Sequence, residues 1–335
     1  MKRRIALGFA LAVVLLTLLV SFVGSDDVVE NLLSADYRIV ALGLASGTLA
    51  LLFRGLVWVR FLSLVDDTAT RGRIGSIFLA AMFVKYATPY GQVATEPFVA
   101  YLVSRDSEMA YEDGLAGILS ADLLNYVPYY TFGFLAIASI MTAGTVGDDM
   151  LTYLTAFGGL FVVVITLSYL VVRQPVLVYR IVLGITALVR RTLGQLSEKA
   201  AKALAPDTIR ERLDGFYQSV ETITSDRKNL AIATIYAHLG MVFLMLPVYI
   251  GAVALGYEIA FPVVALVVAL GKLGSIVPAP GGLGGVEAVV TAGLTTLAQF
   301  DPPAAFTVAI IYRACTYGLT LGLGGICAIG IVFRK

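Results

Sequence analysis

About eight long apolar runs occupy most of this chain, at residues 5–23, 39–64, 74–103, 115–141, 151–172, 229–256, 261–298 and 304–333. A helix of about 20 apolar residues crosses the hydrocarbon core of a bilayer. The composition agrees, because 59% of the residues are hydrophobic and only 14% are charged, against about 25% charged in an ordinary soluble domain. We therefore predict an all-α integral membrane protein with about eight membrane segments.

The distribution of Lys and Arg predicts the orientation of these segments. Lys2, Arg3 and Arg4 precede the first run, which is too long for a signal peptide. The stretch 173–228 is rich in basic residues, and the sequence ends in Arg334 and Lys335. Because basic loops stay on the cytoplasmic side, we expect a multi-pass protein of the cell membrane with both termini in the cytoplasm.

We expect one transmembrane domain over residues 1–335, with a first half at 1–172, a cytoplasmic connector at 173–228 and a second half at 229–335. The connector carries apolar residues at helical spacing. These are Ile209, Leu213, Phe216, Val220 and Ile223. Such a pattern is typical of an amphipathic helix that lies on the bundle or on the bilayer surface.

Two of the apolar runs are broken near their middle. Thr88-Pro89-Tyr90-Gly91 interrupts the run 74–103, and residues 278–282 (Pro-Ala-Pro-Gly-Gly) interrupt the run 261–298. Each half is too short to cross comfortably, and the charge distribution requires each run to start and end on one side. We therefore predict six full spans and two broken hairpins that enter from opposite faces, each of them re-entrant or a pair of short spans.

The two breaks share a pattern that indicates an internal repeat. Pro89 to Glu96 and Pro280 to Glu287 both read P-x-G-x-x-x-x-E, and each follows an upstream lysine, Lys85 or Lys272. Matching broken segments of opposite orientation are typical of inverted-topology repeats, whose binding site lies between the broken helices near the midplane.

The charged residues of the hairpins are candidates for that site. A carboxylate inside a membrane is costly, so Glu96 and Glu287 need partners. A lysine of the opposing hairpin is one, and the N-terminus of the following helix, which each glutamate would cap, is another. We expect the two glutamates to approach each other's hairpins, with Lys85, Lys272 and Arg313 nearby. The surplus positive charge would suit a phosphate head group.

Other polar residues in the apolar runs have less defined roles. Asp122 and Asn125 are one helical turn apart and predict either a polar inner face or a packing contact. We expect His238, the only histidine, to make a hydrogen-bonded contact between helices. Arg54 and Arg60 are interpreted as basic residues near a helix end that reach toward the membrane surface.

The residues from Pro278 to Glu287, followed by Tyr312-Arg313, resemble the flippase-like transmembrane region of lysylphosphatidylglycerol synthases and its stand-alone relatives. The first break and the following Tyr101-Leu102-Val103-Ser104-Arg105 are similar to an earlier motif of that family. The resemblance covers nearly the whole chain. It assigns site roles to Glu96, Arg105, Pro278, Pro280, Gly281, Gly282, Gly284, Glu287 and Arg313.

The resemblance implies movement of lipids with anionic or lipid-linked polar head groups between leaflets. The sequence departs from the family pattern after the first hairpin. Many relatives have E-R-x-x-D there, whereas this chain has Ala121-Asp122-Leu123-Leu124-Asn125. An equivalent charge network is therefore not implied there. The synthase domain is also absent, so aminoacylation by this chain is not expected.

We accordingly predict a lipid flippase, or a transporter of lipid-linked molecules, whose partners are membrane lipids. The alternatives are an ion-coupled transporter of a small solute and the membrane subunit of a lipid-modifying transferase. A flippase requires a groove that opens sideways to lipid, whereas a solute carrier requires a closed cavity. The sequence carries no nucleophile–base pair, metal-ligand cluster or nucleotide fingerprint. We expect no enzyme activity, cofactor, metal or nucleic-acid partner, and a homo-oligomer is compatible with the sequence.

Overall fold

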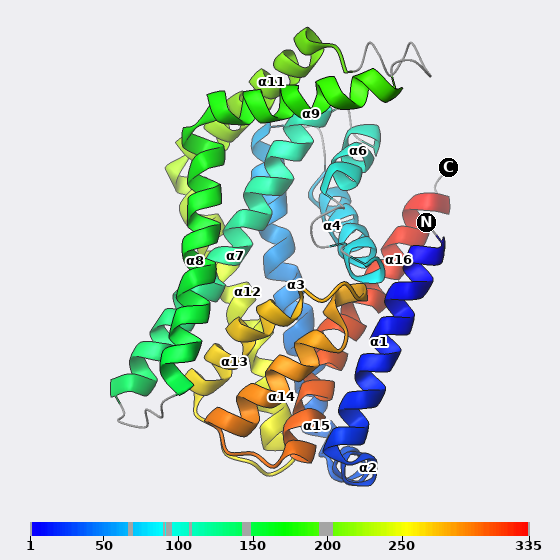
Figure 1. The fold of residues 1–335 in the computed structure, drawn as a ribbon, viewed down its shortest axis with the longest axis vertical. Coiled ribbons are helices and arrows are strands. Elements are labelled where there is room, and N and C mark those ends of the chain that lie inside the picture. Colours follow the sequence, from blue (N-terminus) through cyan, green and yellow to red (C-terminus); the bar gives the residue numbers. More distant parts are fainter. Residues whose placement is uncertain are drawn as a thin grey trace.

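A computed structural model describes residues 2–65, 70–89, 91, 96–106, 109–142, 149–193 and 204–333. Within these ranges every regular element is a helix, and most of the helices run roughly along the long axis of the molecule (Figure 1). The prediction of an all-α membrane protein is confirmed.

Four helical segments are long and apolar enough to cross a membrane. They are α3 (Tyr37–Val65), α7 (Tyr111–Thr142), α12 (Arg227–Ala254) and the segment Pro302–Ile331, which is formed by α15 (Pro302–Arg313), the π-helical turn η2 (Ala314–Gly318) and α16 (Leu319–Phe333). Two bent helix pairs raise the count among the described residues to as many as six. The six full spans expected from the sequence therefore stand at the upper end of this range.

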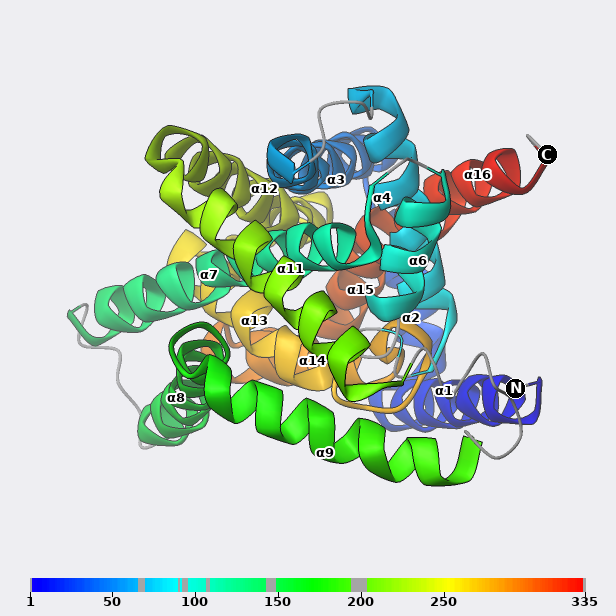
Figure 2. The same ribbon diagram turned by 90° about the horizontal axis from the view of Figure 1, so that it is seen from above.

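Local sequence explains both bends. Between α1 (Lys2–Val23) and α2 (Ser25–Ser34) the chain turns by 89° at Gly24, whose φ of 104° is a conformation that favours glycine. Between α8 (Asp149–Arg173) and α9 (Pro175–Leu193) it turns by 86°, because Pro175 has no N–H with which to continue α8. α9 consequently runs across the end of the bundle rather than along it (Figures 1 and 2).

The two broken runs form helical hairpins with short arms. The first consists of α4 (Arg71–Ala87, 17 residues) and α6 (Glu96–Asp106, 11 residues). The second consists of α13 (Phe261–Gly274, 14 residues) and α14 (Gly285–Leu297, 13 residues). All four arms are shorter than the about 20 residues that cross a bilayer. The hairpins occupy opposite ends of the bundle, and the break of the second lies against α4 of the first (Figure 1).

The packing of the helices follows an inverted repeat. α3 and α12, which precede the hairpins, pack along each other. The first arm of each hairpin packs against the long helix of the other repeat, α4 on α16 and α13 on α7. The second arms stay within their own repeats, α6 on α7 and α14 on α15. The two hairpins are thus each held by both halves of the chain.

The connector between the halves covers one end of the bundle. Its amphipathic helix α11 (Pro206–Ser225) packs across α7 (Figure 2). Ile209 and Ile223 of the expected apolar face are buried, and Ser219 donates a 2.5 Å hydrogen bond to Asp113 at the start of α7. The amphipathic pattern in the sequence therefore marks the face that α11 turns to the bundle.

Candidate functional site

The break of the second hairpin reaches the first hairpin in the middle of the bundle. The second break folds into the short 3₁₀ turn η1 (Pro280–Gly282), which contacts α4 of the first hairpin. Gly281 and Gly282 have φ values of 58° and 68°, in the left-handed region where glycine is favoured. A Cβ on Gly281 would also overlap the ring of Tyr317. The glycines of the motif therefore allow a tight turn beside η2.

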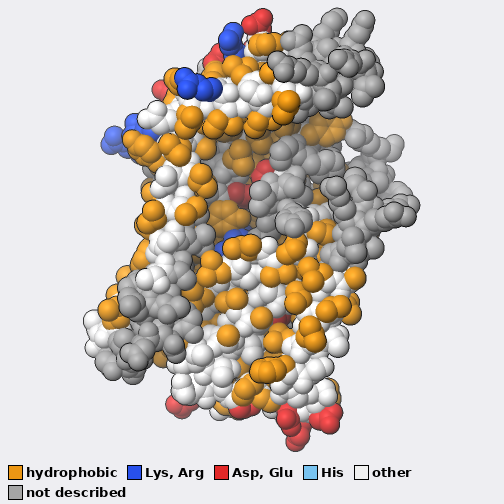
Figure 3. Space-filling model, in the orientation of Figure 1, with side chains coloured by type: hydrophobic (Ala, Val, Ile, Leu, Met, Phe, Trp, Pro, Cys, Tyr) orange, Lys and Arg blue, Asp and Glu red, His pale blue; other side chains and the backbone are white. Residues whose placement is uncertain are grey.

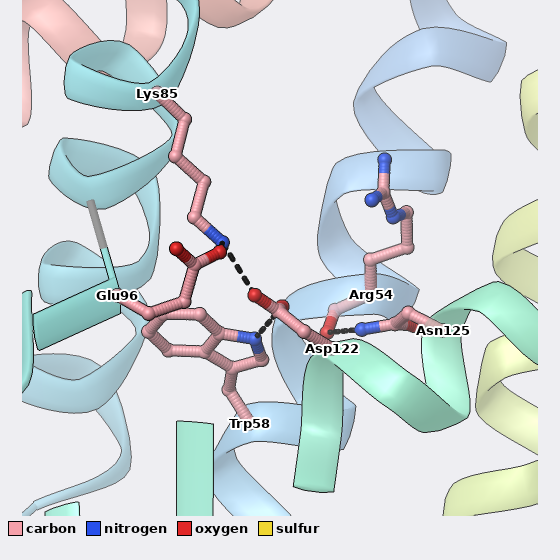
Figure 4. Close-up of polar contacts among 6 residues, drawn as sticks. All are labelled: Arg54, Trp58, Lys85, Glu96, Asp122 and Asn125. Carbon is pink, nitrogen blue, oxygen red and sulfur yellow. Dashed lines mark hydrogen bonds and ion pairs between the residues drawn. The ribbon is translucent and has the colours of Figure 1, made fainter. Parts of the chain in front are cut away.

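Lys85, Glu96 and Asp122 form a buried charge cluster, here called the first cluster (Figure 4). Lys85 Nζ lies 3.0 Å from Glu96 Oε1 and also forms an ion pair with Asp122. Trp58 Nε1 donates a 2.9 Å hydrogen bond to the other oxygen of Asp122. Four helices, α3, α4, α6 and α7, supply these side chains, so the first cluster joins the first hairpin to its own repeat.

Glu287 and Arg313 form the second cluster. Arg313 Nε donates to Glu287 Oε1 at 2.8 Å, and a terminal nitrogen of Arg313 donates to the Gly281 carbonyl at 2.8 Å. The other oxygen of Glu287 accepts the backbone N–H of Gly284 at 2.7 Å. The guanidinium also lies 4.4 Å from the ring centre of Tyr317. Glu287 therefore both caps α14, as one interpretation of the sequence held, and binds a cation.

The pairing of the lysines differs from the expectation. Lys85 contacts Glu96 of its own hairpin, not the glutamate of the opposing one. Lys272 lies 4.7 Å from the ring centre of Tyr126 on α7. The two glutamates thus belong to separate clusters. The physical reason is register, because each hairpin's glutamate faces the long helix that follows it in the same repeat.

Asp122 takes part in a charge network, a point that the departure from the family pattern had left open. Glu287 and Arg313 are 26 residues apart, and Glu96 and Asp122 are separated by the same interval. Asp122 is thus the positional counterpart of Arg313, with the opposite charge. Asn125, one turn further along α7, is buried and donates a 3.4 Å hydrogen bond to the Arg54 carbonyl.

The remaining residues singled out in the sequence have varied placements. Pro278, Pro280, Gly281, Gly282 and Gly284 all lie in the second break, and Gly284, with φ 81°, precedes α14. Arg105 belongs to α6, but its side chain is outside the described residues. His238 Nδ1 lies 2.8 Å from the Thr234 carbonyl and its Nε2 lies 3.4 Å from Thr131 on α7, in agreement with the expected contact between helices.

Sequence reasoning missed the roles of Trp58 and Arg54. Arg54 was expected near the end of its helix, but it lies inside α3, within electrostatic range of Tyr126 and Tyr129 of α7. Its position within the apolar run 39–64 could have indicated this, because an arginine inside an apolar run is expected to face the interior of the bundle, as Arg313 was. Among the described residues, no group of three or more His, Cys, Asp and Glu side chains is placed to hold a metal ion.

A groove runs along α7 from the first cluster, and we call it the lateral groove. It consists of an upper cavity of about 310 Å³ and a lower cavity of about 420 Å³, and Leu123 and Tyr126 line both. Glu96 and Asp122 lie at its charged end, and α8 lines its flank through residues that include Phe161 and Leu167. Figure 3 shows the hollow from the side of the bundle, with acidic and basic side chains on its floor.

α8 borders the lateral groove and contacts α7 near its middle and α11 near its C-terminal end. Phe161 packs against Tyr130 and Phe134 of α7, with both pairs of ring centres 5.0 Å apart. Near the C-terminal end of α8, Tyr217 of α11 donates a 2.8 Å hydrogen bond to the Val171 carbonyl. The residues of both contacts line the lateral groove. The groove therefore joins the flank of the bundle, where lipid would lie, to the first cluster.

Comparison with known proteins agrees with this architecture. Residues 5–324 match the family described as lysylphosphatidylglycerol synthase TM region. Two proteins of Methanothermobacter thermautotrophicus, each named a UPF0104 membrane protein, are 22% and 25% identical to the chain over 325 and 339 residues. These matches cover 97% and 98% of this chain and 94% of each relative. The chain therefore belongs to the family of lysylphosphatidylglycerol synthase transmembrane regions.

Proposed function

We propose that this protein moves lipids with polar head groups, either phospholipids or polyprenyl-phosphate-linked molecules, between the leaflets of the cell membrane. The lateral groove carries the proposal. A lipid needs a path that is open to the bilayer along its length, polar at one end and apolar along the rest. The groove has Glu96 and Asp122 at one end and mostly apolar side chains of α7 and α8 along the rest.

The inverted repeat supports the same proposal. Alternating access requires two halves that pack alike and can exchange positions around a central site. Such an arrangement is present here, because α4 packs on the long helix of the second repeat and α13 packs on that of the first. The ion pairs at the two hairpin tips supply cooperative contacts that differ in charge, so a charged head group can favour one packing over the other.

The proposal includes the orientation inferred from the sequence. The basic connector and both termini face the cytoplasm, and the second hairpin enters from the outside. α11 then closes the cytoplasmic end of the lateral groove through Phe216, Tyr217 and Val220. The partners are membrane lipids, and the protein performs no covalent chemistry on them.

The experiment is a leaflet-exchange assay with two matched variants. The purified protein is placed in phosphatidylcholine vesicles that contain a trace of fluorescent phosphatidylglycerol, and an added reductant quenches the label in the outer leaflet. Wild type should expose the inner-leaflet label faster than empty vesicles do. Leu123→Trp fills the lateral groove and should abolish most of this acceleration. Leu135→Trp changes an exposed residue of the same helix and should not.

The alternatives give different results in the same vesicles. If Leu123→Trp and Leu135→Trp both exchange the label at the wild-type rate, the groove is not the lipid path. If the protein leaves the label in place but takes up a small solute against an ion gradient, it is a solute transporter. Covalent change of the labelled lipid, detected by mass spectrometry, would identify the transferase subunit instead.

A further inference from the structure

α9 does not continue along the bundle with the other long helices. It follows α8 after a bend of 86° and runs across the end that carries the connector (Figures 1 and 2). Because the candidate membrane spans run roughly along the long axis of the molecule, a helix that crosses this axis lies parallel to the plane of the membrane. The direction of α9 therefore suits contact with one surface of the bilayer.

One side of α9 is held by α11. The ring of Tyr179 packs against the ring of Tyr217, with centres 5.8 Å apart and planes inclined by 17°. The Tyr179 hydroxyl also donates a hydrogen bond to Asp214, which belongs to α11 as well. These contacts fix which side of α9 faces the protein.

The opposite side of α9 is apolar and exposed. Successive residues of an α-helix are about 100° apart around the axis, so Leu177, Ile181 and Leu188 lie on the side away from Tyr179. These three residues are 39%, 51% and 66% exposed, and Ile185 beside them is 57% exposed. Figure 3 shows hydrophobic side chains along this helix. An exposed apolar stripe of this length indicates an apolar partner.

The charge of α9 indicates the nature of that partner. The helix contains Arg180, Arg190 and Arg191 and has no Asp or Glu. Arg180 is exposed, and Arg191 follows it by about three turns, so both positions share one side of the helix, next to the apolar stripe. An apolar stripe flanked by basic residues is typical of helices that lie in the interface of a bilayer with anionic lipids.

α11, the other helix of the connector, differs from α9 in both respects. It carries four acidic residues against two arginines, and its apolar Ile209 and Ile223 are buried. α11 thus lies on the bundle, whereas the apolar stripe of α9 is left for another surface. A second copy of the chain that paired through α9 would bring a second set of arginines to the same place, and like charges repel each other.

We propose that α9 lies in the leaflet at this end of the bundle, with its apolar stripe among the acyl chains and its arginines bound to the head groups of anionic phospholipids. In the orientation proposed above, this is the cytoplasmic leaflet. The contact is separate from the lateral groove and does not depend on lipid movement. It still bears on the groove, because α9 holds Tyr217, which lines the upper cavity.

The first test measures the depth of α9 in phosphatidylcholine vesicles that contain phosphatidylglycerol. The full-length protein, with Cys315→Ala and Cys327→Ala, carries a nitroxide label at Ile185→Cys or, as a control on the arginine side, at the exposed Ala187→Cys. Oxygen concentrates among acyl chains and should relax the label at position 185. A water-soluble nickel chelate should relax the label at position 187.

Equal access of the nickel chelate to both labels would overturn the proposal, because α9 would then lie in water. Spin–spin broadening between labels at position 185 of two molecules would also overturn it, and would assign the apolar stripe to a second copy of the chain.

The second test measures the lipids around α9. Energy transfer is recorded from a dye at Ala187→Cys to a trace of phosphatidylglycerol or phosphatidylcholine with a labelled head group. The unmodified helix should favour phosphatidylglycerol, and Arg180→Gln should lower this preference by up to about fivefold, the value of one basic residue near an anionic surface. Arg210→Gln of α11, whose arginine is paired with Asp207 at 3.5 Å, should not change it.

A preference that Arg180→Gln with Arg191→Gln leaves unchanged, or that Arg210→Gln lowers equally, would overturn the binding of head groups by α9. The preference should persist in Leu123→Trp, whose lateral groove is filled, and its loss there would mean that the lipid detected lies in the groove. Vesicles that show the preference but no lipid exchange would keep this inference and reject the proposed function.

Discussion

The two hairpin tips use one framework in opposite ways. In both, a glutamate follows a proline-glycine break and faces a charged residue 26 positions later on the next long helix. In the second repeat that residue is Arg313, so the pair is neutral and needs no further ion. In the first repeat it is Asp122, so a lysine must be inserted between two carboxylates. The opposite charge at this one position is therefore accompanied by a different set of ion pairs in the first repeat.

The two clusters also differ in what they face. Glu287 is 3% exposed, and each of its oxygens has a partner. Glu96 and Asp122 line the lateral groove, and Glu96 Oε2 has no hydrogen-bond partner among the described residues. The second cluster therefore fixes a turn, whereas the first cluster keeps a polar atom available at the groove. We infer that the first cluster contacts substrate and the second holds the framework.

The largest effect is expected for Arg313→Gln. Removing one partner of a buried ion pair costs about 3–5 kcal/mol, because the other charge is left uncompensated. Here the change also removes the donor to the Gly281 carbonyl. Thermal unfolding in detergent should show a large loss of stability. The double variant Glu287→Gln with Arg313→Gln should recover part of it, and a double variant no more stable than Arg313→Gln would contradict the pairing.

The next largest effect is expected from substitution of Gly91 and Gly282, which occupy equivalent positions in the two breaks. Gly282 has φ 68°, and Gly91 packs so closely that a Cβ would overlap the carbonyl of Lys85. Gly282→Ala should cost about 1–2 kcal/mol from its backbone conformation alone. Gly91→Ala should act through displacement of Lys85 and should therefore impair lipid exchange more than stability. Gly72→Ala, where a Cβ meets open space, is the control for both.

The two hairpins could be predicted from the sequence, but the partners of their charged side chains could not. Proline and glycine within apolar runs predicted both hairpins, because these residues break helices whatever surrounds them. The partners of the lysines depended on register, and Lys85 and Lys272 precede their glutamates by different intervals, so treating them as equivalents was wrong. The equal spacing of Glu96–Asp122 and Glu287–Arg313 was the better signal. Trp58 had no signal at all, since its partner lies 64 residues away.

A smaller effect is expected for Asp122→Asn in the first cluster. Glu96 still balances Lys85, and the asparagine oxygen can still accept from Trp58, so the stability cost should be about 1 kcal/mol. Trp58 is the only tryptophan, and its emission reports this cluster directly. We expect a modest shift of that emission with Asp122→Asn and none with Arg313→Lys. A stability loss as large as that of Arg313→Gln would show that the first cluster is equally structural.

The smallest effects are expected where α3 and α12, the first helices of the two repeats, begin. Asp36 accepts the Arg38 N–H at 2.8 Å, and Asp226 accepts both the backbone N–H and the side-chain amide of Asn229, at 2.9 and 2.7 Å. Because Asp226 makes the additional bond, Asp226→Ala should lower the unfolding temperature slightly more than Asp36→Ala. Both changes should be far smaller than that of Arg313→Gln, since these carboxylates lie outside the membrane-spanning segments.

The pH dependence separates this cap from a general charge effect. The hydrogen bond from the Asn229 N–H, aided by its side-chain amide, holds the pKa of Asp226 below its ordinary value of 3.8. A lowered pKa in the folded state contributes stability that is present above the unfolded pKa and is lost as pH falls through the folded one. The difference in unfolding temperature between wild type and Asp226→Ala should therefore be constant near neutral pH and should disappear in acid. A difference that persists after protonation would mean that Asp226 acts through packing and not through its charge.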